Sequence, residues 1–456
     1  MNSPSPARTA PSKRLPLLAY ADGNCVAAWR GAGRVTAGQM LGDALRTAEA
    51  MPESRHVLNL CADRYHFTVA LLAAILRGQT TLMPPSTTPN VIAAMKAFAP
   101  GAYCICDDAQ LEIDLPRFEL PPGGAAITYD VPQVDAQQDV ACLFTSGSTG
   151  EPQPYFKRWG SMVQSMRAEA KRFGIGPGHA VIGTVPSQHM YGFESTVLLP
   201  IICGAALTAE RPYYPADIDE AIARVSSPCV LISTPFHLRT WMESGDPAKL
   251  ESIVSATAPL SVGLARQVEE RTGAKLLEIY GCTETGQVAS RRPSQGVEWE
   301  TFDGIRVALE GAQAMASGGH IEQPTPLQDV IEVLGDGCRF ILHGRTSDMV
   351  NIAGKRNSLG YLNHQLTSIE GVTDGVFFLP DDEGDEAITR LTAFVVAPTL
   401  TASQVLEALR ARLDPTFLPR PIVMVPVLPR ALTGKLPREA LRTLAEQARA
   451  QRAKGP

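Results

Sequence analysis

The sequence contains no run of 18 apolar residues, so we expect no segment to cross a membrane as a helix. Residues 1–15 are rich in Ser, Pro and Arg but have no apolar core, which argues against a signal peptide and predicts a disordered leader. Positive charge is not in excess, because the formal net charge is -6 and the pI is near 5.8. Nucleic acid or an anionic membrane is therefore not expected as the main partner.

The cysteines also lack the paired spacing that is typical of a zinc site. There are nine of them, an odd number, and they are scattered along the chain. Cys104 and Cys106 are two positions apart, which fits a strand better than a metal-binding loop. The sequence therefore predicts buried free thiols in a reduced, cytoplasmic protein.

The chain has ample material for a large core. It has 456 residues, of which 45% are hydrophobic and 19% are charged, and its length suggests about three domain-sized units. Residues 57–84 read as strand, helix, strand, and the same alternation returns from Asp139 onwards. Short apolar segments separated by helical ones predict a layered α/β architecture with largely buried strands.

The pattern changes after about residue 345. Three short β-rich segments and two helical ones, at 401–414 and 437–451, predict a small α+β C-terminal domain. Thr401 or Ser403 is expected to cap the first of these helices. We therefore predict a leader at 1–15, an N-terminal core at 16–345 and a C-terminal lid domain at 346–456.

A glycine-rich loop directly follows the apolar segment 139–144. Glycine allows the backbone to turn tightly and approach a ligand, and exposed amide groups can point at phosphate oxygens. The common phosphate-binding motif GxxxxGK[ST] is absent. On composition alone, the loop fits a flexible linker and a phosphate-binding site equally well. Its members are Thr145, Ser146, Gly147, Ser148, Thr149 and Gly150.

Four segments in a fixed order change this balance: TSGSTGEP at 145–152, YGCTETG at 280–286, GRTSDMVNIAGKR at 344–356 and LTGKLPR at 432–438. Together they resemble the acyl-adenylate-forming superfamily, which contains acyl-CoA synthetases, nonribosomal peptide adenylation domains and luciferases. The resemblance covers roughly residues 55–440. It implies a ligase with a large α/β domain and a mobile small domain. It also implies that ATP and Mg²⁺ are used to form an acyl-AMP with release of pyrophosphate.

The resemblance also implies roles for individual residues. The loop 145–150 would hold the β- and γ-phosphates. Tyr280 would stack near the adenine, Thr283 would contact the α-phosphate, and Glu284 would coordinate Mg²⁺, which prefers oxygen ligands. Asp329 and Arg345 would bind the ribose, although Leu327 and Gln328 replace the usual Thr-Gly before this aspartate.

Lys435 lies in the Thr-Gly-Lys turn at 433–435. In the family this lysine bridges the acyl carboxylate and the α-phosphate. Negative charge builds on the surrounding oxygens as the carboxylate attacks phosphorus, so a fixed cation stabilises the transition state more than the ground state. Without the other motifs, an exposed surface lysine would be the better interpretation.

Two departures from the family pattern concern charged positions. The phosphate loop usually continues Gly-x-Pro-Lys, but Gln153 replaces this lysine, and Lys157 is a candidate to supply the charge. The hinge position after Arg345 usually carries Asp or Lys, but Ser347 stands there, followed by Asp348. A small hydroxyl residue still allows the backbone change of a domain rotation.

The acyl pocket is less sharply marked. His189 occupies a position where family members often have an aromatic residue or histidine that gates the acyl tunnel. The expected pocket walls are small or aromatic residues near the ends of the predicted strands, namely Tyr191, Gly192, Ser233, Ala256, Ala258 and Gly281. No aspartate is placed to pair with an α-amino group, although Glu194 is nearby. We therefore expect an acid without such an amine.

The combination of GSTGEPQPYFKRW, QDVIEV and GKRNSL resembles the stand-alone AMP-ligases of aryl polyene and xanthomonadin-type pathways. These enzymes charge a hydroxybenzoate-like acid onto an acyl carrier protein. Two alternatives remain. One is a CoA ligase of the short succinylbenzoate type. The other is a nucleotide-binding regulatory protein that has lost turnover, and Gln153 in place of the usual loop lysine is the feature that favours it. Basic residues of the last helix are candidates for docking an acidic carrier protein, but they equally fit a solvated helix end: Arg442, Arg449, Arg452 and Lys454.

Overall fold

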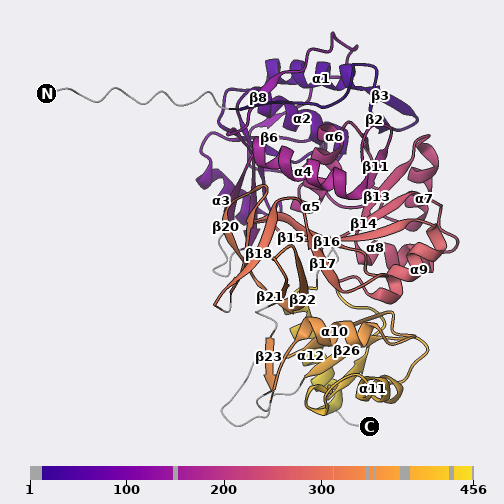
Figure 1. Ribbon diagram of the computed structural model, residues 1–456. Coiled ribbons are helices and arrows are strands. Elements are labelled where there is room, and N and C mark those ends of the chain that lie inside the picture. Colours follow the sequence, from indigo (N-terminus) through magenta and orange to yellow (C-terminus); the bar gives the residue numbers. More distant parts are fainter. Residues whose placement is uncertain are drawn as a thin grey trace.

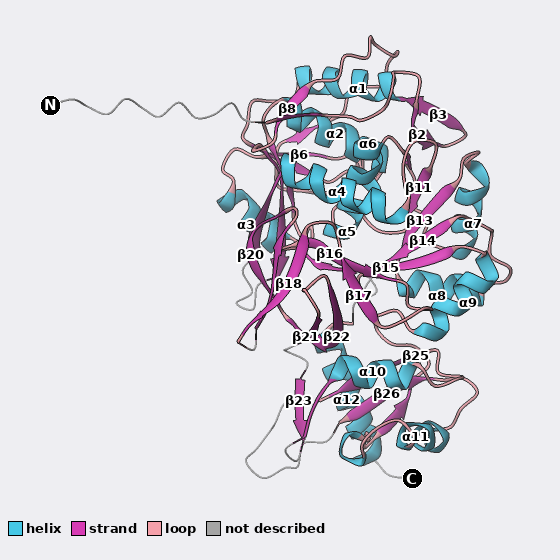
Figure 2. Cartoon of the chain, in the orientation of Figure 1, coloured by secondary structure: helices cyan, strands magenta, loops and turns pink. Residues whose placement is uncertain are grey.

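The computed structural model describes residues 13–146, 152–311, 313–345, 349–352, 355–379, 391–430 and 436–453. A large N-terminal part, coloured indigo to salmon in Figure 1, lies above a smaller orange and yellow C-terminal part. Both combine helices with strands, as Figure 2 shows by colour. The predicted fold class, a layered α/β domain followed by a small α+β domain, is confirmed.

A six-stranded sheet forms one layer of the large part, in the order β10-β9-β5-β4-β6-β7. Its strands run parallel apart from the edge strand β10, which pairs antiparallel with β9. Its strands are β4 (His56–Asn59), β5 (Thr80–Met83), β6 (Tyr103–Ile105), β7 (Arg117–Phe118), β9 (Asp139–Ser146) and β10 (Pro152–Arg158).

An eleven-stranded mixed sheet forms the second layer, in the order β21-β22-β17-β16-β15-β14-β13-β11-β12-β2-β3. Its central strands, from β15 to β2, run parallel, and both flanks are antiparallel. Its strands are β2 (Val26–Arg30), β3 (Gly33–Thr36), β11 (Ala180–Gly183), β12 (Ala206–Thr208), β13 (Cys229–Ser233), β14 (Ser252–Ser255), β15 (Lys275–Cys282), β16 (Gly286–Arg291), β17 (Glu298–Thr301), β21 (Asp329–Leu334) and β22 (Arg339–Arg345).

The alternation of side chains along each strand assigns its two faces to different cores. Val230 and Ile232 of β13 join the main core, whereas Leu231 between them joins a second core with α7, α8 and α9. The main core is shared by both sheets and by helices that lie between them (Figure 1). The helices of the large part are α1 (Ala37–Ala50), α2 (Arg64–Leu76), α3 (Pro89–Phe98), α4 (Trp159–Phe173), α5 (Met190–Gly192), the π-helical η1 (Phe193–Leu198), α6 (Leu199–Cys203), α7 (Pro215–Arg224), α8 (Pro235–Glu243) and α9 (Val262–Thr272).

Smaller sheets complete the large part. One is a three-stranded meander of β18 (Ile305–Glu310), β19 (Gln313–Gly318) and β20 (Ile321–Leu327). Another pairs β1 (Arg14–Pro16) with β8 (Gln133–Asp135). This pairing corrects the predicted leader at its end, because Leu15 is buried and residues 13–15 belong to the folded chain. Residues 1–12 lie outside the described part.

The small C-terminal part has a sheet with helices on both faces. Phe377 of β25 packs with α10 and α11, whereas Val376 and Phe378 face α12, as the period of a strand requires. Thr401, rather than Ser403, caps α11 by accepting a hydrogen bond from the Gln404 amide. The elements are β23 (Met349–Ile352), β24 (Lys355–Ser358), α10 (Leu359–Thr367), β25 (Asp374–Phe378), β26 (Thr392–Val396), α11 (Ala402–Arg410), η3 (Pro415–Phe417), β27 (Ile422–Met424) and α12 (Arg438–Ala453).

The cysteines agree with the expectation of free thiols. All nine cysteines fall within the described residues, and each is a free thiol. Five of them are buried: Cys61, Cys104, Cys106, Cys142 and Cys229. Among the described residues, no helix combines the length and apolar character needed to span a bilayer.

Candidate active site

The parallel strands β11, β13, β14 and β15 place polar residues at one edge of the large sheet. Ser233 pairs in register with Ser255, and Ser255 pairs with Glu278 on the next strand. Since parallel strands end at the same edge, the segments that follow them converge there. This carboxyl edge is the usual position of a ligand site in an open α/β sheet. The predicted site residues Ser233 and Tyr280 both lie on it.

The turn between β15 and β16 contains the predicted residues Thr283 and Glu284. It is a tight reversal, since a Cβ at Gly281 would lie 2.3 Å from the Gly286 carbonyl oxygen. Gly286 adopts φ 73°, a conformation that glycine reaches without strain. Thr283 is partly buried and Glu284 is exposed. The glycines of YGCTETG are therefore explained by this turn, whereas a contact between Gly281 and the acid remains a prediction.

The predicted ribose-binding residues lie next to Tyr280. The Tyr280 phenol donates a hydrogen bond of 2.6 Å to Asp329 Oδ2, and Asp329 stands opposite Arg345 in the β21–β22 register. The Tyr280 ring packs against Trp299 and Phe340, at centroid distances of 5.7 and 5.6 Å. The structure thus brings the Tyr280 and Asp329 side chains together and places the Arg345 backbone beside them. The Arg345 side chain lies outside the described atoms.

Glu284 suits the role of a magnesium ligand. Mg²⁺ is usually held by one or two carboxylates together with phosphate oxygens and water, so an exposed carboxylate on a fixed turn fits it. No cluster of three or more His, Cys, Asp or Glu side chains among the described residues could hold a metal by itself. Glu284 would hold the ion, which would neutralise charge on the phosphates.

The predicted phosphate loop joins β9 to β10. Thr145 and Ser146 end β9, opposite Gln153 and Pro152 of β10, while Gly147, Ser148, Thr149 and Gly150 lie outside the described residues. Gln153, which replaces the family lysine, is exposed. Lys157 is not a substitute for that lysine. It is buried, and its ammonium donates to the Thr283 carbonyl at 2.5 Å.

The predicted acyl-pocket residues of segment 189–193 lie at the start of a helical region. His189 precedes α5 and is partly buried. The Tyr191 phenol donates to the Val254 carbonyl at 2.8 Å, and burial raises the pKa of this phenol well above its usual value. A Cβ at Gly192 would lie 2.0 Å from the Pro186 carbonyl oxygen, so only glycine fits there. Tyr191 thereby ties α5 to the end of β14.

The loop after β14 contains the other predicted pocket residues, Ala256 and Ala258. Between them, Thr257 has φ 79°, the one positive value of a non-glycine residue in the described part of the chain. Glu278 holds this loop from within, because its carboxylate accepts from the Leu260 amide at 2.9 Å and from Arg291 Nε at 2.7 Å. Backbone strain beside a site is a common feature of binding loops.

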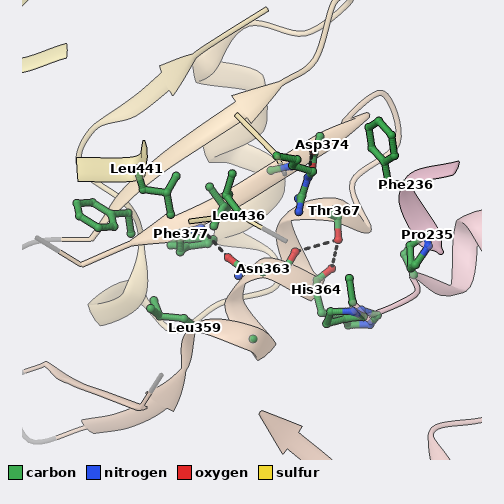
Figure 3. A pocket seen from close by; sticks show the side chains of 18 of the residues that line it. Pro235, Phe236, Leu359, Asn363, His364, Thr367, Asp374, Phe377, Leu436 and Leu441 are labelled. Carbon is green, nitrogen blue, oxygen red and sulfur yellow. Dashed lines mark hydrogen bonds and ion pairs between the residues drawn. The ribbon is translucent and has the colours of Figure 1, made fainter. Parts of the chain in front are cut away.

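A cavity of about 360 Å³ lies between the two parts of the chain. Figure 3 shows Pro235 and Phe236 of the large part facing Asn363, His364, Thr367 and Asp374 of the small part. Thr257 and Ala258 also line it, so the cavity reaches the strand edge described above. Asp374 links the parts, since it accepts two 2.7 Å hydrogen bonds from Arg430 and lies 3.6 Å from Arg239.

The predicted catalytic Lys435 and hinge residues Ser347 and Asp348 lie outside the described residues.

Sequence reasoning missed a buried polar network behind the Thr283–Glu284 turn. The network contains a pair of acids on α4 and η1, Glu169 and Glu194. Burial raises the pKa of Glu169 to about 8 and that of Glu194 to about 7. The Gln287 side-chain amide donates to Glu169 at 3.0 Å. Glu194, the one charged residue of η1, was an available signal, whereas Glu169 lies on a helix with several other charged residues. The partners of both acids are distant in sequence.

A large layered α/β domain with convergent polar residues at its strand edge, followed by a small α+β domain, is the architecture of the adenylate-forming fold. The chain belongs to the AMP-binding enzyme family, whose model matches residues 39–337. It is an acid–thiol ligase of this family. The expectation of an enzyme of this family is thus confirmed.

Curated relatives and solved structures agree with this assignment. The chain is 30% identical over 292 residues to a 4-coumarate–CoA ligase of Rhodobacter capsulatus, covering 63% of this chain and 71% of that protein. It is 28% identical over 366 residues to a 3-hydroxybenzoate/4-hydroxybenzoate–CoA ligase of Thauera aromatica, covering 70% and 69%. Among solved structures, ATP-bound MatB of Rhodopseudomonas palustris superposes with a TM-score of 0.79 at 18% identity, covering 93% and 97%.

Proposed function

We propose that the protein activates an aryl carboxylic acid of the hydroxybenzoate kind as its acyl adenylate. It then transfers the acyl group to the phosphopantetheine thiol of an acyl carrier protein. The observation that carries this proposal is the convergence of Tyr280, Asp329 and the Thr283–Glu284 turn on one strand edge. In this proposal the Tyr280 ring lies near the adenine, the Asp329 carboxylate binds the ribose and the Glu284 carboxylate holds the metal.

The chemistry has two steps. A carboxylate oxygen of the acid attacks the α-phosphorus of ATP, and the bond from phosphorus to pyrophosphate breaks. The thiol sulfur then attacks the acyl carbonyl, loses its proton and displaces AMP. In this proposal Thr283 contacts the α-phosphate, Glu284 holds the metal and Lys435 neutralises the oxygens on which charge accumulates. The loop at 145–150 holds the outer phosphates, and the small domain moves about Ser347 and Asp348 between the steps.

The surroundings of Glu194 support an acid without an α-amino group. Glu194 is the carboxylate nearest to the predicted pocket segment, and a substrate amine would need an accessible anion. The residue is only 4% exposed, and its carboxylate contacts Ser165 Oγ at 3.4 Å. Relatives named for hydroxybenzoates and benzoate support an aryl acid in particular.

The acceptor thiol has two candidates. The resemblance to carrier-protein ligases favours a carrier protein, whereas several relatives are named CoA ligases, which favours CoA. Both deliver a thiol on a long narrow arm, and the cavity between the domains offers an approach to the strand edge. Of the basic residues expected to dock a carrier protein, Arg442 is paired with Glu439 at 3.2 Å. The side chains of Arg449, Arg452 and Lys454 lie outside the described atoms.

The free cysteines support a cytoplasmic setting.

The first experiment measures pyrophosphate release across benzoates, cinnamates, fatty acids and amino acids. We expect release with hydroxybenzoates, and a clear preference for fatty acids or amino acids would contradict the proposed substrate class. The second experiment supplies the preferred acid with either CoA or a phosphopantetheinylated carrier protein. Thioester on the carrier protein supports the main proposal, and thioester on CoA alone replaces it with the second candidate.

A further inference from the structure

Successive carbonyl groups of the turn after β15 are hydrogen-bonded from the protein interior. The Lys157 ammonium donates to Thr283 O at 2.5 Å and to Glu284 O at 3.3 Å. His320 Nε2 lies 3.1 Å from Thr285 O. Because a carbonyl oxygen only accepts, this nitrogen must carry the proton. Lys157 belongs to β10 and His320 follows β19, so elements of two other sheets hold the turn.

Lys157 is placed where its charge interacts with buried groups. It is 6% exposed, and a buried ammonium is unfavourable unless hydrogen bonds or an anion compensate for lost hydration. Burial lowers the pKa of Lys157, and Glu194 makes the largest opposing contribution. Burial raises the pKa of Glu194 to about 7, and Lys157 lowers it. The two groups therefore stabilise each other's charged forms.

Glu194 also contacts the turn. It accepts a hydrogen bond from the Gln287 amide, and a Cβ at Gly286 would lie 2.8 Å from its Oε1. The His320 ring is buried, and burial lowers its pKa to about 4, so it is neutral at physiological pH. The turn is thus fixed by an ammonium, a neutral imidazole and a carboxylate, all inside the protein.

This arrangement determines which groups of the turn face solvent. The carbonyls of Thr283 and Glu284 are occupied by Lys157, whereas the Glu284 side chain is exposed. A flexible turn would have to be ordered each time the nucleotide bound, at a cost in conformational entropy. A turn fixed in advance removes this cost and keeps its side chains close to the reacting geometry.

We propose that Lys157 is a positioning residue for adenylation, whose ammonium holds the Thr283–Glu284 turn in its reactive geometry. It acts through these backbone carbonyls and does not contact the substrate. This inference rests on the proposed function, because the turn matters only if Thr283 and Glu284 meet ATP and the metal. Lys157 thus has a role of its own and does not replace the family lysine that is absent at Gln153.

Lys157→Met tests the inference, with Lys171→Met as the matched control. Lys171 lies on α4, is exposed and pairs with Asp303 at the surface. We expect Lys157→Met to lower kcat for acid-dependent pyrophosphate release about 100-fold, as small misplacements of reacting groups do. The KM for the acid should change little. Transfer to the thiol from supplied acyl adenylate should fall much less, because that step keeps only the Thr283 contact with the α-phosphate and needs neither the metal nor the outer phosphates. The control should match wild type in all three measurements.

A second variant separates positioning from folding. Lys157→Met leaves the Glu194 carboxylate buried without its cation, which can destabilise the protein. The double variant Lys157→Met/Glu194→Gln removes both charges and should recover the thermal midpoint while kcat for pyrophosphate release remains low. The inference is overturned if the single variant keeps its kcat, or if the double variant regains it. If the wild-type protein releases no pyrophosphate with any acid, the proposed function itself fails, which is a different result.

Discussion

Tyr280 and Asp329 are joined by a 2.6 Å hydrogen bond across 49 residues of sequence. Tyr280 ends the parallel part of the large sheet, and Asp329 begins β21 at its antiparallel flank. The bond therefore connects the turn that carries Thr283 and Glu284 to the strand pair that carries Arg345. In the proposed function, the bond orients the aspartate before the nucleotide arrives, which reduces the ordering needed on binding.

Asp329→Asn should raise the KM for ATP about 10-fold and leave kcat nearly unchanged. The substitution preserves size but removes the charge that strengthens hydrogen bonds from the ribose hydroxyls. Tyr280→Phe should have a smaller effect of the same kind, because the ring remains and only the orienting bond is lost. Both are measured by pyrophosphate release at varied ATP. Glu332→Gln, an exposed carboxylate on the same strand, is the control. Equal KM values for Asp329→Asn and this control would refute the ribose role.

Lys435→Ala should lower kcat for pyrophosphate release by about 100- to 1,000-fold, while ATP still binds with nearly wild-type affinity. The reason is that the cation stabilises charge that develops only in the transition state. Calorimetric titration of ATP and a kinetic assay separate the two effects. Lys96→Ala, which removes an exposed lysine paired with Asp114, should leave both unchanged. Undiminished pyrophosphate release by Lys435→Ala would show that another group performs this role.

The sequence predicted the parallel strands of the site well, because β13, β14 and β15 are short apolar runs separated by clear helical patterns. It did not predict β10 as a strand. Pro152 and Pro154 disfavour a central strand, yet β10 is an edge strand, where the missing N–H groups cost little. The leader was placed too far along the chain for a similar reason, since the pairing of β1 with β8 joins segments about 120 residues apart.

The role of Lys157 was beyond sequence reasoning for a different reason. Lysines are rarely buried, so an exposed ammonium near the phosphates was the natural expectation. Its burial depends on carbonyl groups 126 and 127 residues away and on Glu194, which local pattern does not reveal. Tyr280 and Asp329 were identified through family motifs instead, and their hydrogen bond became visible only in the fold. A single sequence does not reveal contacts between residues that are this far apart along the chain.

Thr257→Gly should raise the free energy of unfolding by about 1 kcal/mol. Thr257 has φ 79°, and a β-branched residue in this region is strained, whereas glycine is not. Chemical denaturation measures the change. Thr257→Val is the control, because it removes the hydroxyl but keeps the branched Cβ and the strain. If the glycine variant is no more stable than the valine variant, the backbone at this position stores no strain.

Glu169→Gln should make stability less dependent on pH. Burial, with Glu194 adding to it, raises the pKa of Glu169 from its usual value of 4.5 to about 8, while Ser195 and Gln287 act in the opposite direction. Because the folded pKa lies above the unfolded one, the contribution of Glu169 is fully present below about pH 4.5. It is lost as pH rises through about 8. The variant keeps the shape and has no proton to lose, so its advantage over wild type should grow with pH, to an order of about 3 kcal/mol.

Thermal and chemical unfolding at pH 5, 7 and 8.5 would measure this difference. Tyr191 is also influenced by Glu169, and Glu194 titrates in the same range, but both are present in the variant and in wild type. Glu270→Gln on the exposed face of α9 controls for the loss of a surface carboxylate and should follow the wild-type curve. A constant difference between Glu169→Gln and wild type across this range would mean that Glu169 has the same charge in the folded and unfolded chain. The buried acid pair would then have to be held ionised by the groups around it.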